Sequence, residues 1–327
     1  HTICNIMPFS SAPGKVYLFG EHAVVYGEPA VPCAIDRRIT VSCTKSNDNL
    51  ISIQAPQIGT NDFSIEFSES SLKSNLSKVE PHLHYILTAI GLSLNFSETT
   101  FNGLEIVVES DIPLGAGLGS SAAVSVATVD AVSRTCDVIH PLEQIATLAH
   151  EVEQTVQGRA SRADTFCSTM GGFVCVEGKK CNKLPFSQLP LTIGYDGGFG
   201  STKELVSMVR TNKENYEFIE SIITSIGRIS KLGMVALENQ NLATIGDLMN
   251  INHGLLSSLG VSSNSLDEMV WAARNSGAFG AKLTGAGGSG CIVALDPDMS
   301  AIQSLLSTDS CKSAFSVDIS EKGLIRK

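Results

Sequence analysis

One segment constrains the fold more than any other, a glycine-rich turn that leads directly into an apolar helix. It runs from Pro113 to Ala123 and reads Pro-Leu-Gly-Ala-Gly-Leu-Gly-Ser-Ser-Ala-Ala. Glycine recurs at every second position, and a residue without a Cβ reaches positive φ at little steric cost. The backbone can therefore curl with its N–H groups inward, next to the unsatisfied donors at the start of the helix. A concave turn at a helix N-terminus is typical of a phosphate site.

The flanking sequence supports this interpretation. Residues 104–109 form an apolar strand pattern before the turn, and residues 122–132 form an apolar helix pattern after it. Ser120 and Ser121 could cap the helix, or reach a phosphate oxygen or its Mg²⁺. The alternative is an ordinary strand-to-helix turn with a serine N-cap and no ligand. The candidate phosphate-binding residues are Pro113, Leu114, Gly115, Ala116, Gly117, Leu118, Gly119, Ser120, Ser121, Ala122 and Ala123.

Length and composition exclude several classes of protein. At 327 residues, the chain exceeds the roughly 250–300 residues at which single cores stop growing, so we expect two domains. The net charge of −10 argues against nucleic acid and anionic lipid as partners. No apolar run approaches the roughly 18 residues of a membrane span. The nine cysteines include no CxxC pair, which favours free thiols in a reducing cytoplasm over a zinc site or a disulfide framework.

The N-terminal part is rich in strands. Short apolar or alternating runs predict strands at residues 16–19, 39–41, 51–53 and 63–67, and residues 82–94 predict a helix. Lys15, just before the first strand, is either a cation that faces a phosphate or a solvated lysine at a strand end. Apolar neighbours place Glu21 and His22 at an inner edge, where a polar pair needs partners.

Two carboxylates follow the glycine turn. Pro141 opens a helix whose apolar stripe is bordered by Glu153. A carboxylate at a buried edge needs a cation or donors, but the spacing equally allows a surface glutamate. Residues 158–165 predict a loop that presents Asp164 to a site, with arginines nearby to keep the pKa of its carboxyl low. The alternative for Asp164 is a helix cap.

The C-terminal part is rich in helices, predicted at residues 202–210, 214–238, 242–259 and 265–275, with Ser201 or Thr202 as a cap. Residues 281–295 predict a strand, a glycine loop and a second strand. Gly285, Gly287 and Gly290 match GxGxxG, but a dinucleotide site requires a helix after the loop, so we expect a hairpin-like turn. The sequence contains no P-loop motif and no protein-kinase motifs.

Three segments together carry a resemblance to a known superfamily: residues 12–22, 113–123 and 282–291. In order and spacing they resemble the three signature motifs of the GHMP kinases, which phosphorylate small molecules. The resemblance implies an α+β fold with two domains. Residues 1–178 would form an N-terminal ATP-binding domain of the ribosomal-protein-S5 type, and residues 179–327 a ferredoxin-like C-terminal domain. The active site would lie in the cleft between them.

Residues 20–30 read Gly-Glu-His-Ala-Val-Val-Tyr-Gly-Glu-Pro-Ala. This segment resembles the mevalonate kinase family, in particular its archaeal members, whereas galactokinases carry an Asp-Tyr-Asn type of segment after the same Gly-Glu-His. The resemblance implies ATP- and Mg²⁺-dependent phosphorylation of the 5-hydroxyl of (R)-mevalonate to 5-phosphomevalonate, a step of isoprenoid biosynthesis. We expect a cytoplasmic homodimer that acts on small molecules, without a nucleic-acid or membrane partner.

The resemblance also implies roles for individual residues. Asp164 corresponds to the catalytic base, and Lys15 to the lysine that lowers the pKa of the accepting hydroxyl and neutralises phosphoryl charge. Ser121 and Glu153 correspond to the Mg²⁺ ligands. The substrate-binding positions are Glu21, His22 and Thr202. The ATP-binding positions are all the residues from Pro113 to Ala123, together with Gly285, Gly287 and Gly288.

Two positions depart from the family pattern, and other functions compete. The loop before Asp164 lacks the usual proline, and Ser289 replaces the fourth glycine of the third motif. Phosphomevalonate kinase, or another GHMP kinase, is one alternative, although a phosphorylated substrate would require extra basic residues near Glu21 and His22. A nucleotide-binding sensor without catalysis is another, and a nucleic-acid-binding S5-like protein is disfavoured by the acidic charge balance.

Overall fold

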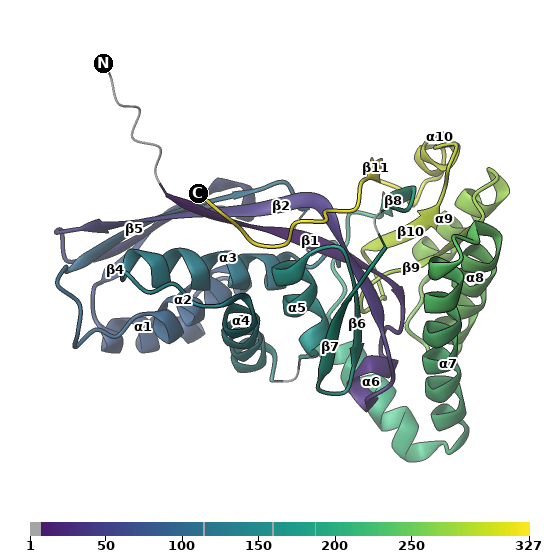
Figure 1. Ribbon diagram of the computed structural model, residues 1–327, viewed down its shortest axis with the longest axis horizontal. Coiled ribbons are helices and arrows are strands. Elements are labelled where there is room, and N and C mark those ends of the chain that lie inside the picture. Colours follow the sequence, from purple (N-terminus) through teal and green to yellow (C-terminus); the bar gives the residue numbers. More distant parts are fainter. Residues whose placement is uncertain (1–7, 114, 159, 187) are drawn as a thin grey trace.

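The computed structural model describes residues 8–113, 115–158, 160–186 and 188–327, which form two sheets with their helices (Figure 1). Within these residues the larger sheet has the order β12-β1-β2-β5-β3-β4, and β6 joins β2 and β7. Its pairs are antiparallel except β3 with β5. Its strands are β1 (Phe9–Phe19), β2 (Val31–Ser46), β3 (Leu50–Ala55), β4 (Thr60–Glu66), β5 (Gly103–Ser110), β6 (Phe173–Glu177), β7 (Lys180–Leu184) and β12 (Ile325–Arg326).

One face of this sheet is covered by helices (Figure 1). The central helix is α3, in which every residue from Ala122 to Ser133 is buried. It contacts β1, β2, α2, α4 and α5, and its alanines, serines and valines allow this close packing on all sides. The core thereby fixes the start of α3, where the glycine turn ends. The helices are α1 (Glu69–Asn75), α2 (Pro81–Ser93), α3 (Ser120–Thr135), α4 (Leu142–Gln157) and α5 (Arg162–Met170), with 3₁₀ turns at Ala23–Tyr26, Pro56–Ile58 and Leu76–Lys78.

The smaller sheet is fully antiparallel, in the order β11-β8-β10-β9. Counted along the chain, this order is 4-1-3-2, that of a ferredoxin-like βαββαβ unit, with several helices in the first connection. This confirms the expected α+β fold. The elements are β8 (Leu191–Tyr195), α6 (Thr202–Asn215), α7 (Phe218–Glu238), α8 (Leu242–Ser258), α9 (Asn264–Asn275), β9 (Gly280–Leu283), β10 (Cys291–Leu295), α10 (Ala301–Leu306) and β11 (Ser313–Val317).

The predicted elements are present, with differences at a few boundaries. The prediction of a loop over residues 158–165 is wrong at its end, because α5 begins at Arg162, where the Ser161 hydroxyl accepts the Ala163 N–H at 3.2 Å. The prediction of a hairpin at residues 281–295 is confirmed by the antiparallel pairing of β9 with β10. The domain boundary after residue 178 stays a prediction, and β7 still pairs with β6 of the larger sheet. None of the helices in the described residues is long and apolar enough to cross a membrane.

Candidate active site

A cleft of about 1460 Å³ is lined by residues from both parts of the chain. The larger sheet and its helices contribute Lys15, Glu21, His22, Glu153 and Asp164, together with the glycine turn. The C-terminal part contributes Thr202, at the first position of α6, and the loop between β9 and β10. The expected position of the site between the two parts is therefore consistent with the fold.

The glycine turn has the expected backbone. Gly115, Gly117 and Gly119 have φ values of 68°, 78° and 78°. Gly119 is the N-cap of α3 and offers no side chain to cap it, so the alternative of a serine N-cap is wrong. A Cβ on Gly119 would lie 2.8 Å from Cγ of Lys15, which shows that the lysine side chain crosses this residue. The turn thus leaves the first N–H groups of α3 to a ligand and seats Lys15 beside them.

Several other residues of the predicted ATP site lie in the core beneath the turn. Ala116, Leu118, Ala122 and Ala123 are buried, and the Leu118 carbonyl accepts the Lys15 N–H at 2.8 Å. Pro113 precedes the turn, and Leu114 lies outside the described residues. Ser120 and Ser121 open α3 and line the cleft.

The β9–β10 loop packs against the same turn. A Cβ on Gly285 would lie 3.1 Å from the Gly117 carbonyl oxygen, and one on Gly287 only 2.0 Å from the Val261 carbonyl oxygen. Gly285 and Gly287 line the cleft. The Gly288 N–H instead donates to the Val261 carbonyl at 2.7 Å, so this amide is engaged in holding the loop.

Lys15 and Asp164 form a partly buried ion pair. Lys15 Nζ lies 3.0 Å from Asp164 Oδ2, and the side chains are 4% and 26% exposed. Asp164 lies in the first turn of α5, and Ser168, one turn later, donates a hydrogen bond to the Pro13 carbonyl of β1. The alternative of a helix cap is wrong for Asp164, because Ser161 caps α5. The solvated alternative for Lys15 is likewise wrong.

Ser121 and Glu153 form a second polar pair. The Ser121 hydroxyl donates to Glu153 Oε1 at 2.8 Å, and Glu153 is 2% exposed. The surface alternative for Glu153 is therefore wrong. Burial, and then the nearby Asp164 carboxylate, raises the pKa of Glu153 to about 8, although Ser121 and Lys15 oppose the shift. Because burial disfavours the negative charge of Glu153, a cation bound next to the carboxylate would stabilise it, and the residue is suited to bind one.

Glu21 and His22 obtain partners from the C-terminal part. Glu21 forms a buried ion pair with Lys282 of β9. Burial raises the pKa of Glu21 and lowers that of Lys282, and each charge opposes the shift of the other. Burial also lowers the pKa of His22, whose Nε2 lies 2.8 Å from the Ala286 carbonyl oxygen. A carbonyl only accepts, so Nε2 carries the hydrogen and Nδ1 remains an acceptor.

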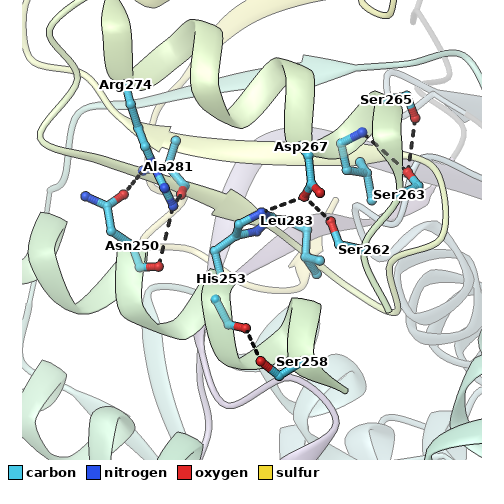
Figure 2. Close-up of polar contacts among 12 residues, drawn as sticks. Asn250, His253, Ser258, Ser262, Ser263, Ser265, Asp267, Arg274, Ala281 and Leu283 are labelled. Atoms are coloured by element: carbon cyan, nitrogen blue, oxygen red, sulfur yellow. Dashed lines mark hydrogen bonds and ion pairs between the residues drawn. The ribbon is translucent and has the colours of Figure 1, made fainter. Parts of the chain in front are cut away.

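A polar network behind β9 holds this strand (Figure 2). The Leu283 N–H donates to His253 Nδ1 at 3.2 Å, and His253 Nε2 lies 3.0 Å from Asp267 Oδ1. Burial lowers the pKa of His253 to about 4, so the ring is neutral near pH 7. Leu283 lies between Lys282 and Thr284, and the network therefore fixes the two residues that reach β1.

Sequence reasoning missed three residues of the site. Tyr17 donates a hydrogen bond to Asp164 Oδ1 at 2.7 Å, and its position two residues after Lys15 on one strand was the available signal. Lys282 was detectable as a charged residue in an apolar strand. Ser161 was detectable as a serine three residues before an acidic residue, a pattern that starts helices.

Three family models match the chain: "GHMP kinases N terminal domain" at residues 84–172, "GHMP kinases C terminal" at 234–307, and "Galactokinase galactose-binding signature" at 8–45. The mevalonate kinase of Thermococcus onnurineus is 44% identical over 96% of this chain and 97% of its own length. That of Pyrococcus horikoshii is 46% identical over 88% of each chain. The crystal structure of the Methanococcus jannaschii mevalonate kinase is 29% identical and covers 97% of this chain and 99% of its own, with a TM-score of 0.82. Motifs, fold and near full-length relatives agree, and the chain belongs to the mevalonate kinase family of the GHMP kinases.

Proposed function

We propose that this protein transfers the γ-phosphoryl group of ATP to the 5-hydroxyl of (R)-mevalonate. The observation that carries the proposal is the Lys15–Asp164 ion pair, at 3.0 Å, beside a glycine turn at the start of α3. Phosphoryl transfer mainly requires positioning, charge stabilisation and a residue that takes the proton of the attacking hydroxyl. The choice of mevalonate rests on relatives that are 44–46% identical and carry this name.

In the proposed reaction the 5-hydroxyl oxygen attacks the γ-phosphorus, and the bond from this phosphorus to the β–γ bridging oxygen breaks. Asp164 accepts the proton of the hydroxyl as the new bond forms. Lys15 pairs with Asp164 and also faces the turn, where its charge offsets the negative charge of the transferred group. The N–H groups of the glycine turn and of the first turn of α3 hold the phosphates. The products are 5-phosphomevalonate and ADP.

Mg²⁺ is part of the proposal, and Ser121 and Glu153 would hold it. Both offer oxygen, the ligand type that Mg²⁺ prefers, and Glu153 is a buried carboxylate with a raised pKa. The described residues contain no cluster of three His, Cys, Asp or Glu side chains suited to a metal. This fits an ion that takes its remaining ligands from phosphates and water. When bound, it would neutralise charge on the β- and γ-phosphates.

The substrate side agrees better with mevalonate than with a phosphorylated substrate. Lys282 is buried and paired with Glu21, so its charge is already compensated. His22 offers Nδ1 as an acceptor for a substrate hydroxyl, and Thr202 lines the same cleft. The intact pairs Lys15–Asp164 and Ser121–Glu153 argue against a sensor that has lost catalysis.

The test is an ADP-release assay with ATP and either MgCl₂ or EDTA, using mevalonate, phosphomevalonate, galactose and homoserine as acceptors. We expect ADP release only in the reaction that contains both mevalonate and MgCl₂. The product of that reaction should have the mass of 5-phosphomevalonate. Equal or faster turnover of another acceptor would overturn the substrate assignment. Unchanged turnover in EDTA would overturn the role of Mg²⁺.

The assembly and the compartment are further parts of the proposal. We expect a cytoplasmic homodimer, and the eight cysteines of the described residues are free thiols, which fits a reducing compartment. Light scattering during gel filtration tests the dimer: a mass near the 34.6 kDa of one chain would refute it.

A further inference from the structure

Tyr17 is the residue of the site to which the proposed reaction has not yet given a role. It lies on β1 two residues after Lys15, so both side chains point to the same face of the strand. The residue is 5% exposed. Its hydroxyl donates to Asp164 Oδ1 at 2.7 Å, and Lys15 Nζ lies 4.6 Å from the centre of its ring. Tyr17 therefore contacts both members of the ion pair.

The hydrogen bonds around Tyr17 run in one direction. Asp164 is an acceptor on both oxygens, because Lys15 donates to Oδ2 and Tyr17 to Oδ1. Tyr17 has a single hydroxyl proton, which is used on Asp164, so Ser161 is the donor across the 3.4 Å between the two hydroxyl oxygens. Ser161 in turn accepts the Ala163 N–H at 3.2 Å. The start of α5 thus connects through two hydroxyls to the carboxylate.

Both the hydroxyl and the backbone of Tyr17 are fixed by their surroundings. Burial, and then the charge of Asp164, raises the pKa of Tyr17 well above its ordinary value of 10, so the hydroxyl keeps its proton. The Tyr17 N–H donates to Thr284 Oγ1 at 2.8 Å, and Lys282 Nζ lies 3.5 Å from the Tyr17 carbonyl oxygen. Strand β9 and the residue that follows it therefore fix the backbone that carries the phenol.

We infer that Tyr17 is a positioning residue that holds the Asp164 carboxylate in its reactive orientation. Each carboxylate oxygen has two acceptor sites, and Tyr17 and Lys15 together occupy one on each oxygen. The carboxylate plane is then fixed, and the remaining acceptor sites face defined directions, one of them available to the substrate hydroxyl. Without the phenolic hydroxyl, Asp164 is held by Lys15 alone and rotates about its last bond. This inference rests on the proposed function, because it assigns the base role to Asp164.

The test is Tyr17→Phe, which removes the hydroxyl and keeps the ring beneath the Lys15 ammonium. We expect kcat to fall by about 10-fold, in the range for imperfect alignment of a base, while KM for ATP and mevalonate stays within twofold. Tyr216→Phe is the matched control, since it removes a phenolic hydroxyl at a position that is 53% exposed. The control should keep the wild-type kcat. A kcat of Tyr17→Phe within twofold of wild type overturns the inference.

A double-mutant cycle separates positioning from a general structural effect. In an Asp164→Asn background, Tyr17→Phe should change single-turnover rates by less than twofold, because its effect acts through the carboxylate. The same 10-fold loss in that background would overturn the inference. If Tyr17→Phe melts well below wild type, Ser161→Ala probes the other end of the chain of hydroxyls, and an unchanged kcat there counts against the inference.

The wild-type rate with mevalonate is a separate readout. If wild type does not phosphorylate mevalonate, the proposed function is wrong, and the Tyr17 variants are then compared on the acceptor that does consume ATP. The inference itself fails only on the comparisons of the Tyr17 and Ser161 variants with wild type.

Discussion

Replacing Gly119 by alanine should damage catalysis far more than stability. Gly119 has φ 78° and is the N-cap of α3. A Cβ there would lie 2.8 Å from Lys15 Cγ, 3.0 Å from Cε and 3.2 Å from the Lys15 backbone nitrogen. The backbone nitrogen of Lys15 cannot move far from the added Cβ, because its N–H donates a hydrogen bond to the Leu118 carbonyl. The lysine side chain must therefore move away from the turn.

The magnitude has two parts. The positive φ costs an alanine about 1–2 kcal/mol, which corresponds to a few degrees of melting temperature for a chain of this size. The displaced Lys15 loses the 3.0 Å contact with Asp164 Oδ2 and its place beside the phosphates. Removing such a charge from a transferred phosphoryl group is expected to lower kcat by about 10²-fold or more, because it acts where charge develops.

Gly158→Ala is the matched control. Gly158 has φ 82° and ψ −32°, against φ 78° and ψ 27° at Gly119. Apart from its chain neighbours, no atom of the described residues lies within 4 Å of a Cβ added to Gly158, so this alanine also has a positive φ but makes no collision. Both variants should melt below wild type, and steady-state assays should show the loss of kcat in Gly119→Ala alone. A Gly119→Ala enzyme with kcat within threefold of Gly158→Ala would refute the seating of Lys15 on Gly119.

Three further variants test the charged groups. In EDTA, Glu153→Gln should raise the free energy of unfolding at pH 7 by roughly 3 kcal/mol and have little effect below pH 4.5, because the cost of ionising the buried wild-type carboxyl grows from the ordinary pKa of 4.5 up to about 8. Urea unfolding at pH 4.5, 7 and 8 checks this, and a difference between variant and wild type that does not change with pH contradicts it. The same variant should lose most of its kcat at saturating MgCl₂, whereas wild-type activity would return Glu153 to a packing role. Asp164→Asn should lower kcat by about 10²-fold or more with an unchanged melt, since Ser161 caps α5; an active enzyme refutes the base. Lys282→Met should cost about 3–5 kcal/mol in urea unfolding, because Glu21 is left buried without its cation, and adding Glu21→Gln should restore part of this loss; equal stability of the single variant and wild type would contradict the reasoning.

The sequence was sufficient where local patterns decide the structure. Alternate glycines before an apolar helix pattern predicted the positive φ values of the turn. Helical spacing placed Glu153 beside the apolar stripe of its helix but left a surface position equally open, and the structure shows that the residue is buried. The start of α5 was predicted as a loop because residues 158–165 contain polar and small residues without a helical apolar period. In the structure the helix nevertheless begins at Arg162, and the Ser161 hydroxyl caps it.

Partners distant in sequence could not be predicted from one chain. Lys282 pairs with Glu21 across 261 positions, and Tyr17 donates to Asp164 across 147. A lysine in an apolar strand indicates a buried charge that needs a partner, but the identity of that partner depends on how the two sheets pack together. The family resemblance supplied the expected roles of Lys15 and Asp164, and the geometry added Tyr17, which lies in the first motif segment but had no role assigned from the sequence.

The pairing of β12 with β1 has a consequence for how the chain is synthesised. Ser10 and Ser11 of β1 pair with Arg326 and Ile325, and Arg326 also binds Asp130 of α3. During translation one edge of β1 stays unpaired until residues more than 300 positions later have been synthesised. The larger sheet therefore cannot be completed before the C-terminal part has been made, and an exposed strand edge persists in the nascent chain.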